Sequence, residues 1–207
     1  MHALSTAAQR EAFEQGNELD FGATFEAKSR LRVNIARQRG EPVCALRMLR
    51  RAIPTLDELH LPSVCKTLAD LEKGLVLVTG PTGSGKSTTL AAMLEHINRS
   101  AARHIVTIED PIEYIFEEKQ SLFTQREVGT DTQSFQAALK HALRQDPDVI
   151  MVGEMRDLET IAATLTAAET GHLVLATLHT PSAPETVDRI IDVFPADQQA
   201  QIRTQLA

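Results

Sequence analysis

A short stretch of the sequence, Gly80 to Thr88 (GPTGSGKST), has the spacing G-x-x-x-x-G-K-[ST] of a phosphate-binding loop. It lies between an apolar run, GLVLVTG, and a segment with helical periodicity, GKSTTLAAMLEHINR. A chance match in a glycine-containing turn would lack this strand-before, helix-after context. Glycines allow backbone N–H groups to wrap around phosphates, and the start of the following helix favours their negative charge. The stretch therefore predicts a nucleotide site.

Each polar side chain of this loop has a predicted task. Lys86 would reach the β- and γ-phosphates, and the Ser87 hydroxyl would ligate Mg²⁺. The backbone N–H groups of Thr88 and Thr89 would add donors near the α- and β-phosphates. We therefore expect ATP and Mg²⁺ to bind at the loop and the first turn of the helix, namely at Gly80, Pro81, Thr82, Gly83, Ser84, Gly85, Lys86, Ser87, Thr88 and Thr89.

Carboxylates follow two of the other apolar runs. VTIEDPIEY carries Glu109 and Asp110 at the end of its apolar part and Glu113 after a proline turn, and DPDVIMVGEMRD carries Glu154. At the carboxyl end of a parallel strand such groups face the crevice where ligands bind. Glu154 would orient and polarise water for attack on the γ-phosphate, and Glu109 would support the water or the metal shell. Asp110 is a candidate to hold Mg²⁺ through a water.

Gly153 stands directly before Glu154, at a place where many nucleotide hydrolases carry an aspartate that holds magnesium. Two interpretations are open. Either the acid chemistry is divided between Glu154 and the neighbouring strand, or Glu154 is a buried carboxylate satisfied by an arginine such as Arg156. Asp110 and Glu113 have a similar alternative, because loops are often acidic without a catalytic role.

Two histidines flank the apolar run of TGHLVLATLHT. His179 ends the expected strand on the same side as the phosphate loop, where it would donate a hydrogen bond to a γ-phosphate. His172 precedes the strand and is the weaker candidate for a nucleotide sensor. A structural role is the alternative for both. No set of His, Cys and Asp residues has the spacing of a zinc site.

The segments that would position these groups alternate between strands and helices from Leu68 onward. Residues 74–80, 104–110, 148–153 and 173–180 are continuously apolar and are expected to be strands. The segments between and after them have helical periodicity, with two further helices expected at 183–194 and 196–207. Continuously apolar strands separated by helices imply an α/β fold with a mostly parallel sheet covered on both faces.

The first 52 residues have a different pattern. LRVNIA and VCALRML alternate like strands around the turn segment RQRGEP, which predicts a hairpin. Because a lone hairpin is barely stable in water, we expect it to be the last part of a larger sheet domain. Residues 53–67 contain two prolines and are expected to be a linker with one short helical turn. Residues 68–207 are the expected α/β domain.

Composition excludes several classes of protein. The net charge is −7, although eight basic residues lie between Lys28 and Arg51 against Glu41 alone, so the rest of the chain is strongly acidic. An acidic body with 4% aromatic residues offers little surface for nucleic acid. No apolar run approaches the roughly 18 residues of a membrane helix, and the N-terminus lacks the pattern of a secretory signal. Two unclustered cysteines, Cys44 and Cys65, suggest a reducing cytoplasm.

Four ordered motifs together resemble those of the secretion-superfamily ATPases. GPTGSGKSTTLAAM, IVTIEDPIEY, DPDVIMVGEMRDLETI and AAETGHLVLATLHT are similar to the Walker A, aspartate-box, atypical Walker B and histidine-box motifs of that family. The likeness runs from about Glu18 to Ala207. After the histidine box, APETVDRIIDVFPADQQAQIRTQLA is most similar to the retraction-type, PilT-like members.

This resemblance implies a RecA-like ATPase core at 68–207, incomplete at its C-terminus, preceded at 1–52 by the C-terminal part of a PAS-like α+β domain. It implies an ATP-hydrolysing motor for type IV pilus retraction and twitching motility. Such a motor is a cytoplasmic hexamer, peripheral at the inner membrane, that acts on a pilus platform protein. An arginine from the N-terminal side or from a neighbouring subunit would touch the nucleotide. Arg32, Arg37 and Arg47 are the candidates, with a solvated strand face as the alternative.

Two other functions are compatible with the same motifs. One is a pilus assembly ATPase or a type II/IV secretion ATPase of the same superfamily. The other is a regulatory subunit that binds nucleotide without hydrolysing it. Compared with the family, the chain starts inside the N-terminal domain and stops before the C-terminal domain is complete, so we expect it to be a fragment.

Overall fold

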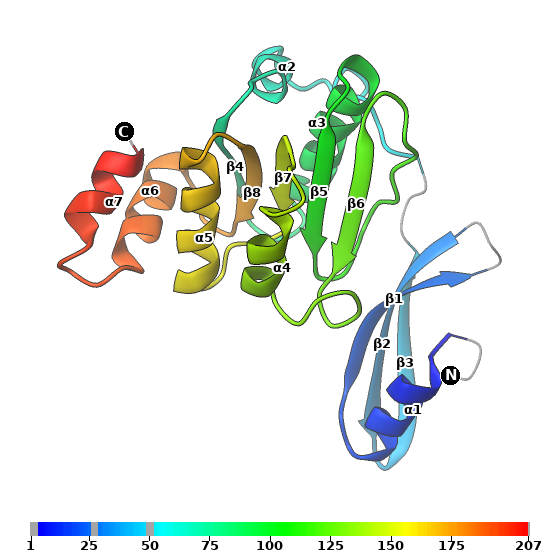
Figure 1. The fold of residues 1–207 in the computed structure, drawn as a ribbon. Coiled ribbons are helices and arrows are strands. Elements are labelled where there is room, and N and C mark those ends of the chain that lie inside the picture. The colour runs from blue at the N-terminus through cyan, green and yellow to red at the C-terminus, as the bar shows by residue number, and fades with distance from the viewer. Residues whose placement is uncertain (1–3, 26–28, 49–51, 207) are drawn as a thin grey trace. The chain divides into compact units, whose positions relative to one another are not determined.

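The structure is a computed structural model of the chain, and it describes residues 4–25, 29–48 and 52–206. The chain forms two compact units, Met1–Ile53 with Asp110–Ile115 and Pro54–Glu109 with Phe116–Ala207 (Figure 1). The boundary after residue 53 lies beside the one expected after residue 52. The expected linker, residues 53–67, is almost entirely part of the second unit. That Asp110–Ile115 packs with the first unit was not predicted.

The first unit is an antiparallel three-stranded sheet with one helix. Its elements, in the sheet order β1-β2-β3, are α1 (Ala7–Glu14), β1 (Leu19–Phe25), β2 (Ser29–Gln38) and β3 (Glu41–Met48). The expected hairpin is confirmed, since Gln38 pairs with Glu41 across a two-residue turn. Both turn residues, Arg39 and Gly40, have positive φ values (53° and 85°), as a turn that matches the twist of the strands requires.

One face of this small sheet is apolar. Leu31, Val33 and Ile35 alternate along β2 and are buried together with Phe21 of β1 and Phe13 of α1. The helix was not predicted, but its start has a capping box in which Thr6 and Gln9 exchange hydrogen bonds. The alternation that predicted the strand is therefore the pattern that buries its face.

The second unit contains a five-stranded parallel sheet. Its strands, in the order β4-β8-β7-β5-β6, are β4 (Gly74–Thr79), β8 (Leu173–Leu178), β7 (Val149–Val152), β5 (His104–Glu109) and β6 (Leu122–Glu127). The four expected strands are all present, which confirms the α/β prediction. The edge strand β6 was not predicted, because its sequence LFTQRE is too polar to give an apolar run.

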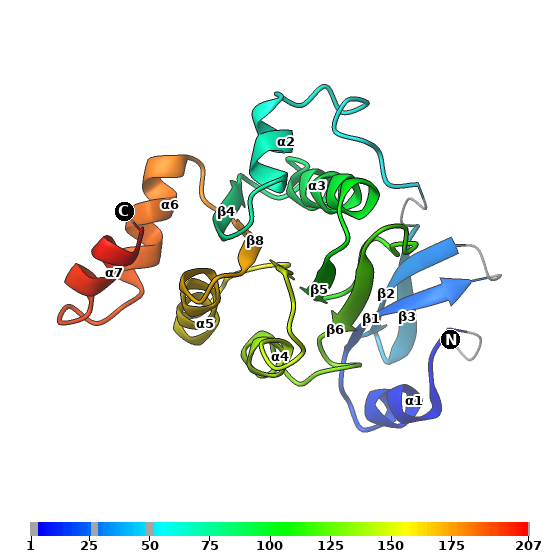
Figure 2. The same ribbon diagram turned by 45° about the horizontal axis from the view of Figure 1, so that its top comes forward.

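Helices cover both faces of this sheet. They are α2 (Val64–Ala69), α3 (Lys86–Ser100), α4 (Phe135–Ala142), α5 (Leu158–Glu169), α6 (Ala183–Asp192) and α7 (Gln199–Leu206). Figure 2 shows α2 and α3 on one side of the sheet and α4 and α5 on the other. Side chains of Ser134, Asp157 and Ser182 cap the starts of α4, α5 and α6. Within the described residues, no helix is both long and apolar enough to cross a membrane.

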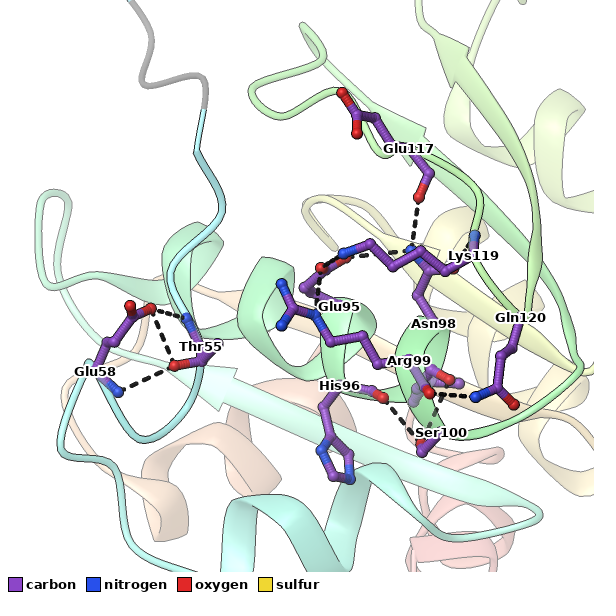
Figure 3. A network of polar contacts seen from close by, with 11 residues as sticks. Thr55, Glu58, Glu95, His96, Asn98, Arg99, Ser100, Glu117, Lys119 and Gln120 are labelled. Atoms are coloured by element: carbon purple, nitrogen blue, oxygen red, sulfur yellow. Dashed lines mark hydrogen bonds and ion pairs between the residues drawn. The ribbon is translucent and has the colours of Figure 1, made fainter.

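The connection from β5 to β6 is not helical, and a polar network fastens part of it to α3 (Figure 3). The side chain of Asn98 donates to Glu117 O (2.8 Å) and accepts from Lys119 N (3.0 Å). Glu95, which is 4% exposed, accepts from Arg99 Nε (2.7 Å) and from Asn98 Nδ2 (3.2 Å), and also pairs with Lys119. The helix that follows the phosphate loop therefore holds the chain that leads away from β5.

Burial raises the pKa of the Glu95 carboxyl, but hydrogen bonds from Lys119, Arg99 and Asn98 outweigh burial and hold its pKa below the usual range. A depressed folded-state pKa stabilises the fold above the unfolded-state pKa, and this contribution is lost as the pH falls through the folded-state value. We expect Glu95→Gln to lower the free energy of unfolding at pH 7 by about 1–2 kcal/mol, because charge-assisted hydrogen bonds to partly exposed partners are lost.

Urea denaturation at pH 7 and near pH 3 measures this prediction. The difference between Glu95→Gln and wild type should shrink at the lower pH. Glu72→Gln, at an exposed position before β4, is the matched control and should change little at either pH. An equal loss at both pH values would contradict the proposed electrostatic cause.

Candidate active site

The loop between β4 and α3 has the geometry that its glycines predict. Gly80, Gly83 and Gly85 have φ values of 146°, 80° and 96°, a region that residues with a side chain rarely adopt. A Cβ atom at Gly80 would lie 2.8 Å from the Ser84 hydroxyl oxygen. The backbone therefore follows a tight path that only these glycines permit, and α3 starts directly from it at Lys86.

Lys86 is buried inside this loop. Its ammonium group donates to the carbonyl oxygens of Gly80 (2.8 Å) and Pro81 (3.0 Å) and lies 3.4 Å from His179 Nδ1. Thr82 Oγ1 lies 3.5 Å from the same ring nitrogen. His179 therefore lies beside the phosphate loop, on the side of the sheet expected from the sequence, and its hydrogen bond to a γ-phosphate stays a prediction.

Glu154 extends this chain of contacts. Its Oε1 lies 3.3 Å from His179 Nε2, and its Oε2 lies 2.7 Å from Arg156 Nη2. The side chain of Glu154 is 20% exposed. Lys86, His179 and Glu154 follow β4, β8 and β7, three adjacent strands, and together they form a connected polar row at the carboxyl edge of the sheet.

The charges of this row act on Glu154. Burial raises the pKa of its carboxyl, but the hydrogen bond and the charge of Arg156, followed by the charges of His179 and Lys86, outweigh burial and lower the pKa below the usual value. Glu154 is therefore ionised at neutral pH, as a general base must be. Glu154 thus pairs with Arg156, as the second interpretation expected, and it also faces the histidine next to the phosphate loop. A division of the acid chemistry with the neighbouring strand stays a prediction.

Glu109 ends β5 and is 7% exposed. Its Oε1 accepts hydrogen bonds from Thr107 Oγ1 (2.8 Å) and Gln125 Nε2 (3.5 Å). Gly153 N donates to Ile108 O (2.8 Å), so Glu109 lies beside the turn that carries Glu154. Gln125 was not found from the sequence, because it lies on the unpredicted strand β6. The only local signal for Gln125 was its place two residues before Glu127 in QRE, a glutamate that the structure shows to be buried.

The structure does not bring His172 to this row. His172 lies at the amino edge of the sheet, where its carbonyl accepts from Gly74 N. Its ring contacts Ala167 O (2.9 Å) and Thr170 Oγ1 (3.2 Å), so that it closes the end of α5. The two histidines flank one strand, and the direction of that strand places only His179 near the phosphate loop.

Asp110, Glu113 and the three candidate arginines belong to the first unit. Arg32 pairs with Asp20 through two hydrogen bonds (2.7 and 3.2 Å). The hydrogen bond from Arg32 to Asp20 raises the pKa of its guanidinium, burial opposes this, and the charges of Asp20, Glu113 and Asp110 add to the rise. The carboxylates of Asp110 and Glu113, after β5, thus stabilise the positive charge of Arg32 on β2.

Arg37 and Arg47 have different surroundings. The guanidinium of Arg37 lies over the Phe13 ring (4.6 Å to its centre) and donates to Phe13 O and Gly40 O (3.4 Å each). Arg47 is exposed on β3, directly across from Arg32 in the strand register. Of the three arginines, only Arg47 lies on β3, a strand whose described side chains are all exposed.

A parallel sheet with a phosphate loop after β4 and with acids and a histidine at its carboxyl edge defines the P-loop NTPase fold with a RecA-like core. A family model described as type II/IV secretion system protein matches residues 15–206. The chain therefore belongs to the type II/IV secretion system protein family, which confirms the resemblance found in its four motifs.

Individual relatives show which members of this family the chain resembles. The type IV pilus retraction ATPase PilT of Pseudomonas aeruginosa is 53% identical over 199 residues, which cover 96% of this chain and 58% of the relative. A twitching motility protein of Neisseria gonorrhoeae is 52% identical over 96% of this chain and 53% of its own length. A crystal structure of the pilus retraction motor PilT with bound ADP superposes with a TM-score of 0.95 at 51% identity, covering 99% of this chain and 60% of that one. The chain thus spans between half and two thirds of these relatives.

Proposed function

We propose that this chain is the nucleotide-binding and hydrolysing part of a motor ATPase that powers retraction of type IV pili, the basis of twitching motility. The observation that carries the proposal is the polar row from Lys86 through His179 to Glu154 beside the phosphate loop. The similarity to PilT, whose crystal structure contains ADP, supports the choice of nucleotide and of motor.

The residues of the loop fit Mg²⁺–ATP as ligand. The glycines give the loop its tight path, Lys86 lies inside it, and Ser87 stands at the first turn of α3. Lys86 would bind the β- and γ-phosphates, and Ser87 would hold Mg²⁺, with Asp110 as a candidate water-mediated ligand. When bound, Mg²⁺ neutralises charge on the phosphate oxygens.

The acids and the histidine then have separate tasks. Glu154 is ionised and would accept the proton of the attacking water. Glu109, held by Thr107 and Gln125, would support the water or the metal shell. His179 lies between Glu154 and Lys86. It would donate a hydrogen bond to the γ-phosphate and so act as a sensor of bound ATP in contact with Glu154. Arg32, Arg37 or Arg47 would stabilise transition-state charge in an assembled oligomer.

By similarity to its relatives, the protein would act as a cytoplasmic homo-oligomer, a hexamer, peripheral at the inner membrane. It would work on the platform protein of the pilus, without binding nucleic acid and without inserting into the membrane. ATP hydrolysis would turn or shift the platform protein and return pilin subunits to the membrane. A pilus assembly ATPase or a type II/IV secretion ATPase is the alternative within the family, and a subunit that binds ATP without hydrolysing it is the alternative outside enzymes.

Two measurements test this function. The purified protein should release phosphate from ATP in the presence of Mg²⁺, and tight ATP binding without phosphate release would support the non-hydrolysing alternative. In cells, deletion of the gene should leave surface pili in place while twitching stops. Loss of the pili themselves would favour the assembly ATPase instead.

A further inference from the structure

The carboxyl ends of β5 and β7 lie side by side. The two strands pair up to Ile108 and Val152, and one residue further Gly153 N donates to Ile108 O (2.8 Å). Gly153 is therefore next to the peptide that joins Ile108 to Glu109. Its carbonyl oxygen is held from the other side by the Thr177 hydroxyl of β8 (2.5 Å).

No side chain fits at Gly153 without movement. A Cβ atom there would lie 3.1 Å from Ile108 O, 3.4 Å from Glu109 Cα and 3.8 Å from Glu109 Cγ. The φ angle of Gly153 is not in the left-handed region, so the requirement for glycine comes from space and not from backbone conformation. The nearest atom, Ile108 O, belongs to the backbone of the buried strand β5 and would have to move by a few tenths of an ångström. Relief would shift the Ile108–Glu109 peptide and, with it, Glu109.

The Glu109 side chain is itself held in one place. Thr107 and Gln125 donate to the same oxygen, and they come from β5 and β6. A buried carboxylate needs such partners, because burial without them is costly. The position of Glu109 thus depends on β6 on one side and on the absence of a side chain on β7 on the other.

We propose that Gly153 is a positioning residue, whose missing side chain lets Glu109 of the neighbouring strand supply the second carboxylate beside Glu154. This proposal rests on the proposed function and assigns a cause to the glycine in the motif VGEMRD. An aspartate at 153 would add a carboxylate next to Glu109, and two such charges in one site oppose each other's ionisation. β5 therefore carries the second carboxylate, Glu109, and Gly153 at the end of β7 leaves room for it.

Gly153→Ala tests the proposal in kinetics of the full chain. We expect kcat for ATP hydrolysis to fall up to about 10-fold, since relief of the 3.1 Å contact needs a shift of a few tenths of an ångström, less than the misplacement of about 1 Å that can cost about 100-fold. KM for ATP should stay near the wild-type value, because the phosphate loop is untouched. In a Glu109→Ala background the same substitution should cost little more, because its effect acts through Glu109. Effects that multiply in the double variant would overturn the proposal.

Two further variants separate positioning from loss of stability. Gly171→Ala introduces a side chain at a positive φ (105°) at the amino edge of the sheet, with nothing within 4 Å, so it should destabilise the fold without lowering kcat. Thr107→Val removes a hydroxyl that holds Glu109 and leaves Gly153 and the rest of the β7 sequence unchanged. It should lower kcat, leave KM unchanged and also lose its effect in the Glu109→Ala background. If Gly171→Ala lowers kcat as much as Gly153→Ala at equal loss of stability, the proposal fails.

A crystal structure of Gly153→Ala provides a readout that does not depend on activity. Displacement of the Glu109 carboxylate from Thr107 and Gln125 is expected, and an unmoved Glu109 would overturn the inference. Absence of ATP hydrolysis by the wild-type protein would count against the proposed function alone, because the position of Glu109 would still decide the role of Gly153.

Discussion

Glu154→Gln is expected to lower kcat for ATP hydrolysis by about 10²- to 10⁴-fold, the range found when a general base is removed. Glutamine has the shape of glutamate and can keep a hydrogen bond to His179, but it cannot accept a proton from water. The lowered pKa of Glu154 keeps the wild-type carboxylate ready for this task at neutral pH. KM for ATP should change little, because Lys86 and the glycine path of the loop remain intact.

Phosphate release at saturating Mg²⁺–ATP measures this prediction. Glu159→Gln is the matched control: Glu159 lies five residues further on, exposed in the first turn of α5, and its loss should leave kcat unchanged. A kcat of Glu154→Gln close to wild type would remove Glu154 as the base. Glu109, a buried acid at the same edge of the sheet, would then be the candidate to replace it.

Lys86→Ala is expected to weaken ATP binding by about 10- to 150-fold, which corresponds to the loss of about 1.5–3 kcal/mol for hydrogen bonds to a charged group. Hydrolysis should fall below detection, because the same ammonium group would neutralise charge on the transferred phosphate. The structure gives the reason for so large an effect. Lys86 is buried in the loop and is held by the carbonyls of Gly80 and Pro81, so its charge has a defined position.

Calorimetric titration with ATP measures the affinity. Lys73→Ala, which removes an exposed lysine just before β4, is the matched control and should bind ATP like wild type. Because alanine at position 86 also removes two hydrogen bonds of the loop, thermal unfolding of both variants should be compared. Unchanged affinity of a folded Lys86→Ala protein would contradict a phosphate site at this loop.

The sequence was sufficient for the local elements that carry the site. Apolar runs predicted four of the five strands of the parallel sheet, and the spacing of glycines and lysine predicted the loop before α3. Alternation predicted the hairpin of β2 and β3. These features are set by residues close together in the chain, so a window of about ten residues contains the information that specifies them.

Features that depend on distant residues were missed. The edge strand β6 is polar, and its pairing with β5 depends on the neighbour and not on its own composition. Because β6 was not predicted, Gln125 was not identified as a partner of Glu109. The packing of Asp110–Ile115 with the first unit was equally invisible, because the contacts of this segment lie far away in the sequence.

The sequence by itself determined that this chain has a phosphate loop, two acids after apolar strands and a histidine after a third. The tertiary structure decided which of them meet, because the sheet order β4-β8-β7-β5-β6 differs from the chain order. This order places His179 between Lys86 and Glu154, and the direction of β8 places His172 at the opposite edge. It also places Gly153 against Glu109, which gives a steric reason for a glycine that the sequence alone could only note as unusual.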